Sequence, residues 1–372
     1  MPKKKETEKR YYDINPLLKL GAEYNIIMGE RSNGKTYSVL KTMLTHFIKT
    51  GEYGVYLRRY ADEILPANIK GLFQPFEKDL DKLTKGKYNH IAYRGKEFSI
   101  GLYDFEKDKW LSKEPFCFTA ALNTWENAKG PDRGIVGIIL FDEFLSRRYY
   151  LTNEFLSFQN VLSSFMRDRA NATVFLVGNT VSFYSPYFEE FGLENIKDMK
   201  VGDLACFTYD NGTKIAVQYT ESVGETKESA KFFNFNSKKA NMITTGKWEI
   251  PDYPHYAGSI DFIREVLFKF FIKFDNETVC GNLVKHKDDL FLYFHMQTKD
   301  FEEDENLIFE TTVSGNPKHF TSLNSSVMIY GDTMRLVNKL IDSDKMFFST
   351  NKVGEIFNNY YKWQSRFSVL GL

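Results

Sequence analysis

The feature that most constrains the fold is a glycine-rich turn between a short apolar segment and an amphipathic one. The apolar segment, YNIIM (24–28), has the length and the side chains of a buried strand. After the turn, apolar residues recur at helical spacing through residues 40–48, and Gly51 follows as a helix-ending residue. A strand that enters a helix through glycines predicts an α/β fold built on a parallel sheet.

The turn itself, GERSNGKT (29–36), matches the pattern G-x-x-x-x-G-K-[ST] at every position. Glycines allow backbone N–H groups to converge on phosphate oxygens, and the following helix adds its dipole. Lys35 would reach the β- and γ-phosphates of ATP, and the hydroxyl of Thr36 would bind Mg²⁺. The expected nucleotide-binding residues of this Walker A turn are Gly29, Glu30, Arg31, Ser32, Asn33, Gly34, Lys35, Thr36 and Tyr37.

An acidic pair follows a second apolar segment. GIVGIILF (134–141) is continuously apolar, as a central parallel strand buried on both faces must be, and Asp142 and Glu143 come directly after it. In this Walker B position Asp142 would hold Mg²⁺, and Glu143 would act as general base on the attacking water. The alternative is a pair of acids that only caps a strand end. The order of the two motifs and the Asp-Glu pair favour nucleotide hydrolysis.

Strand and helix patterns alternate through the first half of the chain. They predict a P-loop NTPase sheet of the additional-strand (ASCE) type, mostly parallel, with helices on both faces. Asn179 ends one of the strands where such proteins keep a polar residue that senses the γ-phosphate; an asparagine in an ordinary turn is the alternative. Further strands are expected at 53–60, 115–122, 173–179 and 212–220, a hairpin at 90–103 and a helix at about 154–169.

The sequence pattern changes after about residue 210, and three strand-like segments with short polar connections predict an antiparallel meander at 267–297. We therefore expect a second, α+β domain. The expected division is a flexible basic tail at 1–20, a P-loop ATPase domain at 21–220, a linker or lid at 221–256 and the α+β domain at 257–372.

Composition adds exclusions. The net charge is zero, so any contact with nucleic acid must come from local basic patches. The sequence has no stretch of 18 apolar residues, so no membrane-spanning helix is predicted. The three cysteines are far apart, have no metal-site spacing and suggest no disulfide framework, which fits a reducing cytosol.

Several arginines are candidates for the nucleotide site. Arg31 occupies a motif position that the Walker A pattern leaves free, and it would act in cis or link to a neighbouring subunit. Arg167 and Arg169 end the helix before the strand at 173–179; one of them would be an arginine finger, or both would only complement the helix dipole. Arg58 and Arg59 alternate along a strand, so one of them must face inward or toward the site.

The order of these motifs resembles that of the phi29-type bacteriophage DNA-packaging (genome encapsidation) ATPases. The resemblance covers about residues 20–190 well and the rest only by length and texture. One departure is Ala61, where a basic residue would be expected. The similar segments are the Walker A turn with its arginine, YLRRY (56–60), a basic hairpin, LNTWENAKG (122–130), LFDEF (140–144), SFMRDR (164–169) and LVGNTVSFYSPYF (176–188).

The resemblance implies an ATP-driven motor that pumps double-stranded viral DNA into a preformed procapsid. It implies a ring of identical subunits, expected to be a pentamer, docked on the capsid portal in the host cell cytoplasm, with a packaging RNA as a further partner. It assigns Lys35 and Thr36 to the phosphates and Asp142 to Mg²⁺. Glu143 becomes the catalytic base, and Arg167 becomes a finger that acts in trans.

The resemblance also implies an RNase H-like second domain that has lost nuclease chemistry. Its first strand, LFKFFIKF (267–274), contains no acid, and Asp275 lies only at its end. A two-metal nuclease needs several carboxylates around a metal pair. Other acids, namely Asp288, Asp289 and Asp300, leave open a large-terminase-like motor whose second domain still cuts DNA.

A translocase must hold a phosphate backbone without reading sequence, through Lys and Arg on loops that face a channel. Ordinary solvated surface charge is the alternative for each candidate. The candidates are Lys85, Lys87, Arg94, Lys96, Lys129, Arg147 and Arg148.

Two other functions remain open at this point. One is a nucleotide switch or assembly factor that uses ATP without moving DNA. The other is a small-molecule P-loop kinase, against which the Asp-Glu pair and the missing acceptor-site signature argue.

Overall fold

The structure is a computed structural model of the chain, and its described residues form two compact units. The first unit holds the described residues up to Ser146 and those from Glu154 to Thr220, and the second holds those from Tyr253 onward with a short segment near Tyr150. The structure describes residues 12–29, 33–124, 134–146, 150–151, 153–166, 172–179, 185–193, 196, 198–220, 253–274, 277–297, 299 and 301–364.

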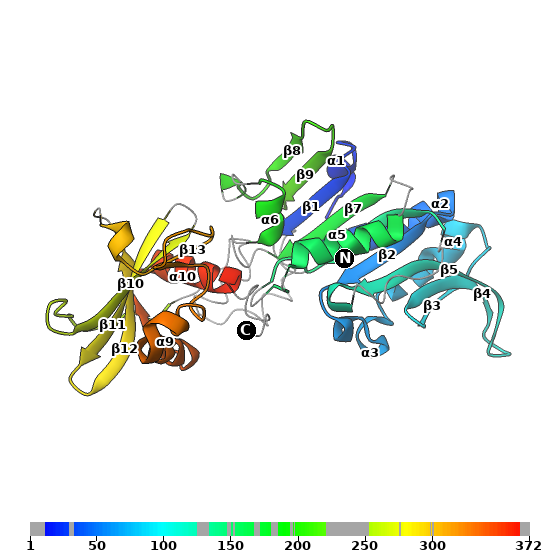
Figure 1. Cartoon of the computed structure of the whole chain (residues 1–372). Coiled ribbons are helices and arrows are strands. Elements are labelled where there is room, and N and C mark those ends of the chain that lie inside the picture. Colours follow the sequence, from blue (N-terminus) through cyan, green and yellow to red (C-terminus); the bar gives the residue numbers. More distant parts are fainter. Residues whose placement is uncertain are drawn as a thin grey trace, which may run out of the picture. The chain divides into compact units, whose positions relative to one another are not determined.

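The first unit is built on a nine-stranded sheet whose order is β3-β4-β5-β2-β6-β7-β1-β9-β8. All neighbours from β5 to β9 are parallel, and antiparallel strands extend both edges. The predicted open, mostly parallel sheet is confirmed (Figure 1). The strands are β1 (Tyr24–Gly29), β2 (Tyr53–Arg58), β3 (His90–Arg94), β4 (Glu97–Asp104), β5 (Lys109–Ala121), β6 (Val136–Asp142), β7 (Thr173–Asn179), β8 (Leu204–Thr208) and β9 (Lys214–Tyr219).

The order of the central strands is the additional-strand arrangement. β7 pairs with both β1 and β6, so it separates the strand of the glycine-rich turn from the strand of the acidic pair. β2, which lies between the two motifs in the sequence, pairs with the other edge of β6. The carboxyl ends of β1, β6 and β7 therefore meet at one edge of the sheet.

Helices cover both faces of this sheet because the strand side chains alternate. Leu140 of β6 belongs to the apolar cluster that includes residues of helix α2 (Lys35–Thr50). The next residue, Phe141, stacks on Phe158 of helix α5 (Glu154–Met166), with 5.7 Å between the ring centroids. Figure 1 shows α2 and α5 in the first unit. The shorter helices are α1 (Asn15–Leu18), η1 (Ala61–Ile64), α3 (Pro66–Ile69), η2 (Gln74–Phe76), α4 (Glu77–Thr84) and α6 (Pro186–Glu190).

The expected flexible tail at 1–20 is wrong for residues 12–20. Leu17 of α1 is fully buried, and Tyr12 and Ile14 pack in the same core cluster. The Tyr12 N–H donates to the Asn33 carbonyl oxygen at 3.1 Å, and the Tyr12 hydroxyl donates to Gln218 at 2.5 Å. Three apolar side chains within six residues outweigh the charged run before them; residues 1–11 lie outside the described part of the chain.

The second unit holds a six-stranded sheet of order β14-β13-β10-β11-β12-β15. The predicted meander is present as β10-β11-β12, with β13 added parallel to β10 and β14 parallel to β13. β15 extends the sheet by pairing parallel to β12. The elements are β10 (Val266–Phe274), β11 (Glu277–His286), β12 (Asp289–Met296), η5 (Glu303–Glu305), β13 (Ile308–Glu310), β14 (His319–Phe320), α9 (Val327–Asp342), β15 (Met346–Phe348) and α10 (Asn351–Gln364).

The second unit begins earlier than the expected residue 257. The Tyr253 N–H donates to the Asn351 side chain at 3.1 Å, and the Phe348 N–H donates to the Pro254 carbonyl oxygen at 2.8 Å. The other expected linker residues, 221–252, lie outside the described residues.

The described residues contain neither a membrane-spanning helix nor a cluster of metal-binding side chains. No helix there is long and apolar enough to cross a membrane. No three His, Cys, Asp or Glu side chains of the described part gather closely enough to hold a metal ion. Asp275 and Asp300 are outside this part of the chain.

Candidate active site

The glycine-rich turn depends on its glycines at both ends. Gly29 ends β1 with φ +151°, and a Cβ there would lie 2.0 Å from the Thr220 hydroxyl oxygen. Gly34 precedes α2 with φ 87°, in the left-handed region that glycine adopts without strain. The backbone conformation and the close approach of Thr220 thus exclude other residues. Glu30, Arg31 and Ser32 lie outside the described residues.

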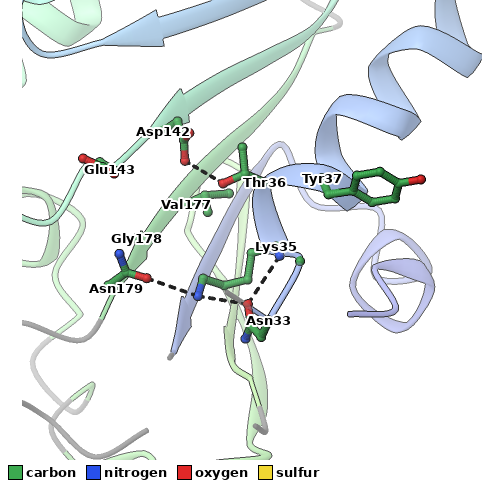
Figure 2. Close-up of a pocket in the computed structure, with 10 residues that line it drawn as sticks. Asn33, Lys35, Thr36, Tyr37, Asp142, Glu143, Val177, Gly178 and Asn179 are labelled. Carbon is green, nitrogen blue, oxygen red and sulfur yellow. Dashed lines mark hydrogen bonds between the residues drawn. The ribbon is translucent and has the colours of Figure 1, made fainter. Parts of the chain in front are cut away.

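Lys35 is only 4% exposed, and its ammonium group lies between two asparagine side chains. Its Nζ donates to Asn33 Oδ1 at 3.1 Å and to Asn179 Oδ1 at 3.5 Å (Figure 2). The amide of Asn33 is fixed in turn, because its Nδ2 donates to the Thr220 hydroxyl at 2.6 Å. The structure therefore brings the predicted Asn179 into contact with the lysine of the turn.

Thr36 and Asp142 meet where α2 begins and β6 ends. The Thr36 hydroxyl donates to Asp142 Oδ1 at 2.9 Å, and the Tyr56 hydroxyl donates to Asp142 Oδ2 at 3.1 Å (Figure 2 shows the first bond). Burial raises the pKa of the Asp142 carboxyl, while Arg58 and the Thr36 hydroxyl oppose that rise. A carboxylate beside a hydroxyl offers the hard oxygen ligands that Mg²⁺ prefers, so this pair fits that ion.

Glu143 has an unusual backbone and an exposed side chain. Its φ of 57° is in the left-handed region, and its side chain is 57% exposed. Its Oε2 accepts a hydrogen bond from Arg58 NH2 at 2.9 Å. Arg58 also binds Glu63 at 2.8 Å and lies 3.7 Å from Asp142 Oδ2. One arginine thus stands beside both acids of the predicted pair.

The two motifs enclose a cavity of about 400 Å³ at the carboxyl ends of β1, β6 and β7. The ring of Tyr37 packs on Phe76, with 4.7 Å between ring centroids, and points away from the Lys35 and Asp142 side chains in Figure 2. The lining residues are Asn33, Gly34, Lys35, Thr36, Tyr37, Asp142, Glu143, Val177, Gly178 and Asn179.

Sequence reasoning missed three contributors to this site: Tyr56, Thr220 and the specific role of Arg58. Tyr56 and Arg58 are two residues apart on β2, a spacing that places both on one face of the strand toward Asp142. That spacing was the available signal. Nothing in the sequence pointed to Thr220, because its contact with Gly29 depends on β9 lying beside β1.

Four of the predicted DNA-contacting residues lie in the described part of the chain, on either side of β3. Lys85 and Lys87 precede β3, whereas Arg94 and Lys96 lie at its other end, at the exposed tip of the predicted hairpin. Lys87 already pairs with Glu114 at 3.4 Å. The remaining candidates and the predicted arginine fingers lie outside the described residues, namely Lys129, Arg147, Arg148, Arg167 and Arg169.

Comparison with known proteins identifies relatives of this chain. Residues 7–206 match the model of the podovirus DNA encapsidation protein (Gp16) family. The DNA packaging protein of Bacillus phage B103 is 30% identical over 173 residues, 45% of this chain and 48% of that protein. The DNA packaging protein of Bacillus phage phi29 is 26% identical over 186 residues, 49% of this chain and 50% of that protein. The match thus spans about half the length of these curated relatives.

Solved structures extend the likeness of the fold over both units. A chain of the Phi-28 gp11 DNA packaging motor gives a TM-score of 0.53 at 17% identity, covering 98% of this chain and 100% of that one. A chain of the phi29 genome packaging motor assembly gives the same TM-score and identity, covering 96% and 99%. Because the family model matches more than half of the sequence, the chain belongs to the podovirus DNA encapsidation protein (Gp16) family.

Proposed function

We propose that this protein binds and hydrolyses ATP to drive double-stranded viral DNA into a preformed procapsid. The observation that carries the proposal is the meeting of Lys35, Thr36, Asp142 and Glu143 at one edge of the sheet, around one cavity. Membership of the encapsidation family supports the proposal that the energy of ATP hydrolysis moves DNA. The relatives from phages B103 and phi29 are themselves named DNA packaging proteins.

The cavity supplies the groups that a triphosphate needs. The ammonium of Lys35, now between Asn33 and Asn179, would turn to the β- and γ-phosphates. Thr36 and Asp142 would hold Mg²⁺, which supplies neutralisation of phosphate charge. Asn179, which stands beside Lys35 on the neighbouring strand end, would contact the γ-phosphate.

Glu143 would accept a proton from the water that attacks the γ-phosphate. Its side chain is the more exposed of the two acids, and the residue belongs to the lining of the cavity. Arg58 donates to Oε2 of this carboxylate and would hold it while the carboxylate accepts the water proton. The same arginine places positive charge beside the acids, which would otherwise repel each other.

The remaining parts of the motor extend beyond one chain. We infer a ring of identical chains, a pentamer, on the capsid portal vertex in the host cytoplasm, with a packaging RNA as a further partner. In this ring Arg167 would act on the neighbouring nucleotide and Arg31 in its own site or at the subunit contact. The structural likeness to chains of packaging motor assemblies agrees with a fold suited to such a ring.

We also propose that the second unit is an RNase H-like domain without nuclease activity. The expected division into a P-loop ATPase domain, a linker and this domain is part of the same proposal. Its test is DNA cleavage with Mg²⁺ or Mn²⁺. Cleavage that disappears on Asp275→Asn would instead identify a large-terminase-like motor with an active nuclease.

The decisive experiment measures the ATPase rate with and without double-stranded DNA in the presence of proheads, with Lys35→Ala as the inactive control. We expect turnover that DNA stimulates and that Lys35→Ala abolishes. Turnover without any response to DNA and proheads would contradict the motor and favour an ATP-dependent assembly factor.

A further inference from the structure

A buried ion pair lies directly behind the acidic pair of the site. Arg59 follows β2, and its side chain is only 6% exposed. Its Nε lies 3.1 and 2.9 Å from the two carboxylate oxygens of Glu154, and its NH2 lies 3.0 Å from Oε1. The Glu154 side chain, on the first residue of α5, is completely buried. Two charged groups are thus held together away from solvent.

The same guanidinium also holds the backbone of the turn that carries Glu143. Arg59 NH1 donates to the Glu143 carbonyl oxygen at 3.1 Å, and NH2 donates to the Phe144 carbonyl oxygen. On the other side of the turn, the Phe144 N–H donates to the Val177 carbonyl oxygen of β7 at 3.2 Å. The backbone that follows Asp142 is therefore fixed from β2 and from β7 at once.

The surroundings fix the ion pair in its turn. The Tyr187 hydroxyl of α6 donates to Glu154 Oε1 at 2.9 Å. The Arg59 guanidinium lies over the Phe141 ring, 5.7 Å from its centroid, and that ring also contacts Phe158. The planar guanidinium therefore has one orientation, in which its fork of N–H donors faces two carbonyl oxygens and a carboxylate.

This network suits positioning better than it suits stability. Burying two charges has a desolvation cost, and apolar side chains of similar volume often serve a fold as well. A non-glycine residue at φ 57°, as at Glu143, persists only where its surroundings over-determine it. The carbonyl groups that Arg59 binds are those of this residue and the next, so the ion pair acts where the backbone is strained.

We propose that Arg59 and Glu154 are positioning residues for hydrolysis: Glu154 orients Arg59, and Arg59 holds the backbone of Glu143 so that its carboxylate lines the nucleotide cavity. The inference rests on the proposed role of Glu143 as general base. The two neighbouring arginines thus have different roles toward Glu143. Arg58 contacts the carboxylate of Glu143, and Arg59 contacts its main chain.

The first test replaces both charges by apolar groups of similar length, in Arg59→Met/Glu154→Met. We expect an ATP affinity close to that of the wild type, because Lys35 and Thr36 stay in place. We expect a lower melting temperature, because the Glu143 and Phe144 carbonyl oxygens and the Tyr187 hydroxyl lose these hydrogen bonds. We expect kcat to fall about tenfold to a hundredfold, because the base is no longer held in place. A double variant that keeps wild-type kcat would overturn the proposal.

A matched variant controls for general weakening of the fold. Val161→Ala lies on the same helix as Glu154, is fully buried and makes a cavity without touching a polar group. It should lower the melting temperature and leave kcat and KM unchanged. If Val161→Ala lowers kcat as much as the double variant does, the ion pair has no special role.

The second test asks whether the effect passes through Glu143. The double variant is combined with Glu143→Gln, and single-turnover hydrolysis is measured in both backgrounds. The loss caused by the double variant should disappear in the Glu143→Gln background. An equal loss in both backgrounds would contradict the inference. The wild-type rate and its loss in Glu143→Gln measure the proposed function separately.

Discussion

The buried polar groups at the cavity of the first unit and two buried amides of the second unit have different kinds of partner. In the first unit, Lys35 and Asp142 are buried and contact side chains from other strands at the edge of the sheet. In the second unit, the buried side chains of Asn282 and Gln364 bond to main-chain groups, the Tyr293 carbonyl and the Leu323 N–H. The first arrangement leaves polar side chains gathered around a cavity, where they can bind a ligand, and the second holds main-chain groups in place.

The largest effect is expected from Glu143→Gln. The amide keeps the shape of the side chain and cannot accept the water proton, so kcat should fall about 10²- to 10⁴-fold. ATP affinity should change little, because Lys35 and Thr36 stay in place. Turnover and equilibrium binding of a fluorescent ATP analogue measure the two effects. Unchanged turnover would show that Glu143 is not the general base and would contradict the assignment of hydrolysis to the first unit.

Gly29→Ala should have the next largest effect. A Cβ at this position meets the Thr220 hydroxyl at 2.0 Å, and such overpacking costs about 1–3 kcal/mol. Because the clash lies within the turn, ATP affinity should fall along with the melting temperature. Gly51→Ala is the control: its φ is 75° and no atom lies within 4 Å of the new Cβ, so it should affect stability alone.

Arg58→Met should have a smaller effect on turnover. It removes the hydrogen bond to Glu143 and the positive charge that lies beside Asp142. We expect kcat to fall roughly tenfold, which is what one charge-assisted hydrogen bond is worth. Arg335→Met in the second unit removes an exposed pair with Asp332 and should change neither kcat nor stability measurably. Equal results for the two arginines would contradict the comparison.

The smallest effect on turnover is expected from Asn282→Ala. This fully buried residue bonds to the Tyr293 carbonyl oxygen at 3.2 Å through its side chain, and losing that hydrogen bond costs about 0.5–1.5 kcal/mol of folding stability. Thermal unfolding should show the loss while the ATPase rate per folded molecule stays constant. A fall in kcat without a fall in melting temperature would show that this unit takes part in hydrolysis.

Much of the first unit followed from local patterns. The glycine-rich turn, the apolar strand before Asp142 and the helix at 154–166 each have a period or a motif that stands out within a few residues. β8 was missed, because its side chains alternate only between exposed and half-buried at the sheet edge, and LACFT has no strong apolar pattern. The meander of the second unit was predicted, but the parallel addition of β13 and β14 was not deduced from the residues.

The site was predictable where chemistry fixes residue types and not where it depends on strand order. Lys35, Thr36 and Asp142 follow from the needs of a triphosphate and a hard cation. The pairing of Arg59 with Glu154 joins residues 95 positions apart, and it exists only because β2 lies beside β6 and α5 covers that face. No periodicity in the sequence contains that information.

The contacts of Tyr12 have a practical consequence for work on this protein. Its N–H, its hydroxyl and its carbonyl oxygen tie the start of the described chain to Asn33, Gln218 and Ser38, and so to the loop and helix around the cavity. A purification tag placed upstream leaves these three bonds intact. Trimming the chain past Asp13 to improve crystals would instead remove these bonds and loosen the glycine-rich turn, and a weaker binding of nucleotide by the shortened chain would then reflect the trimming.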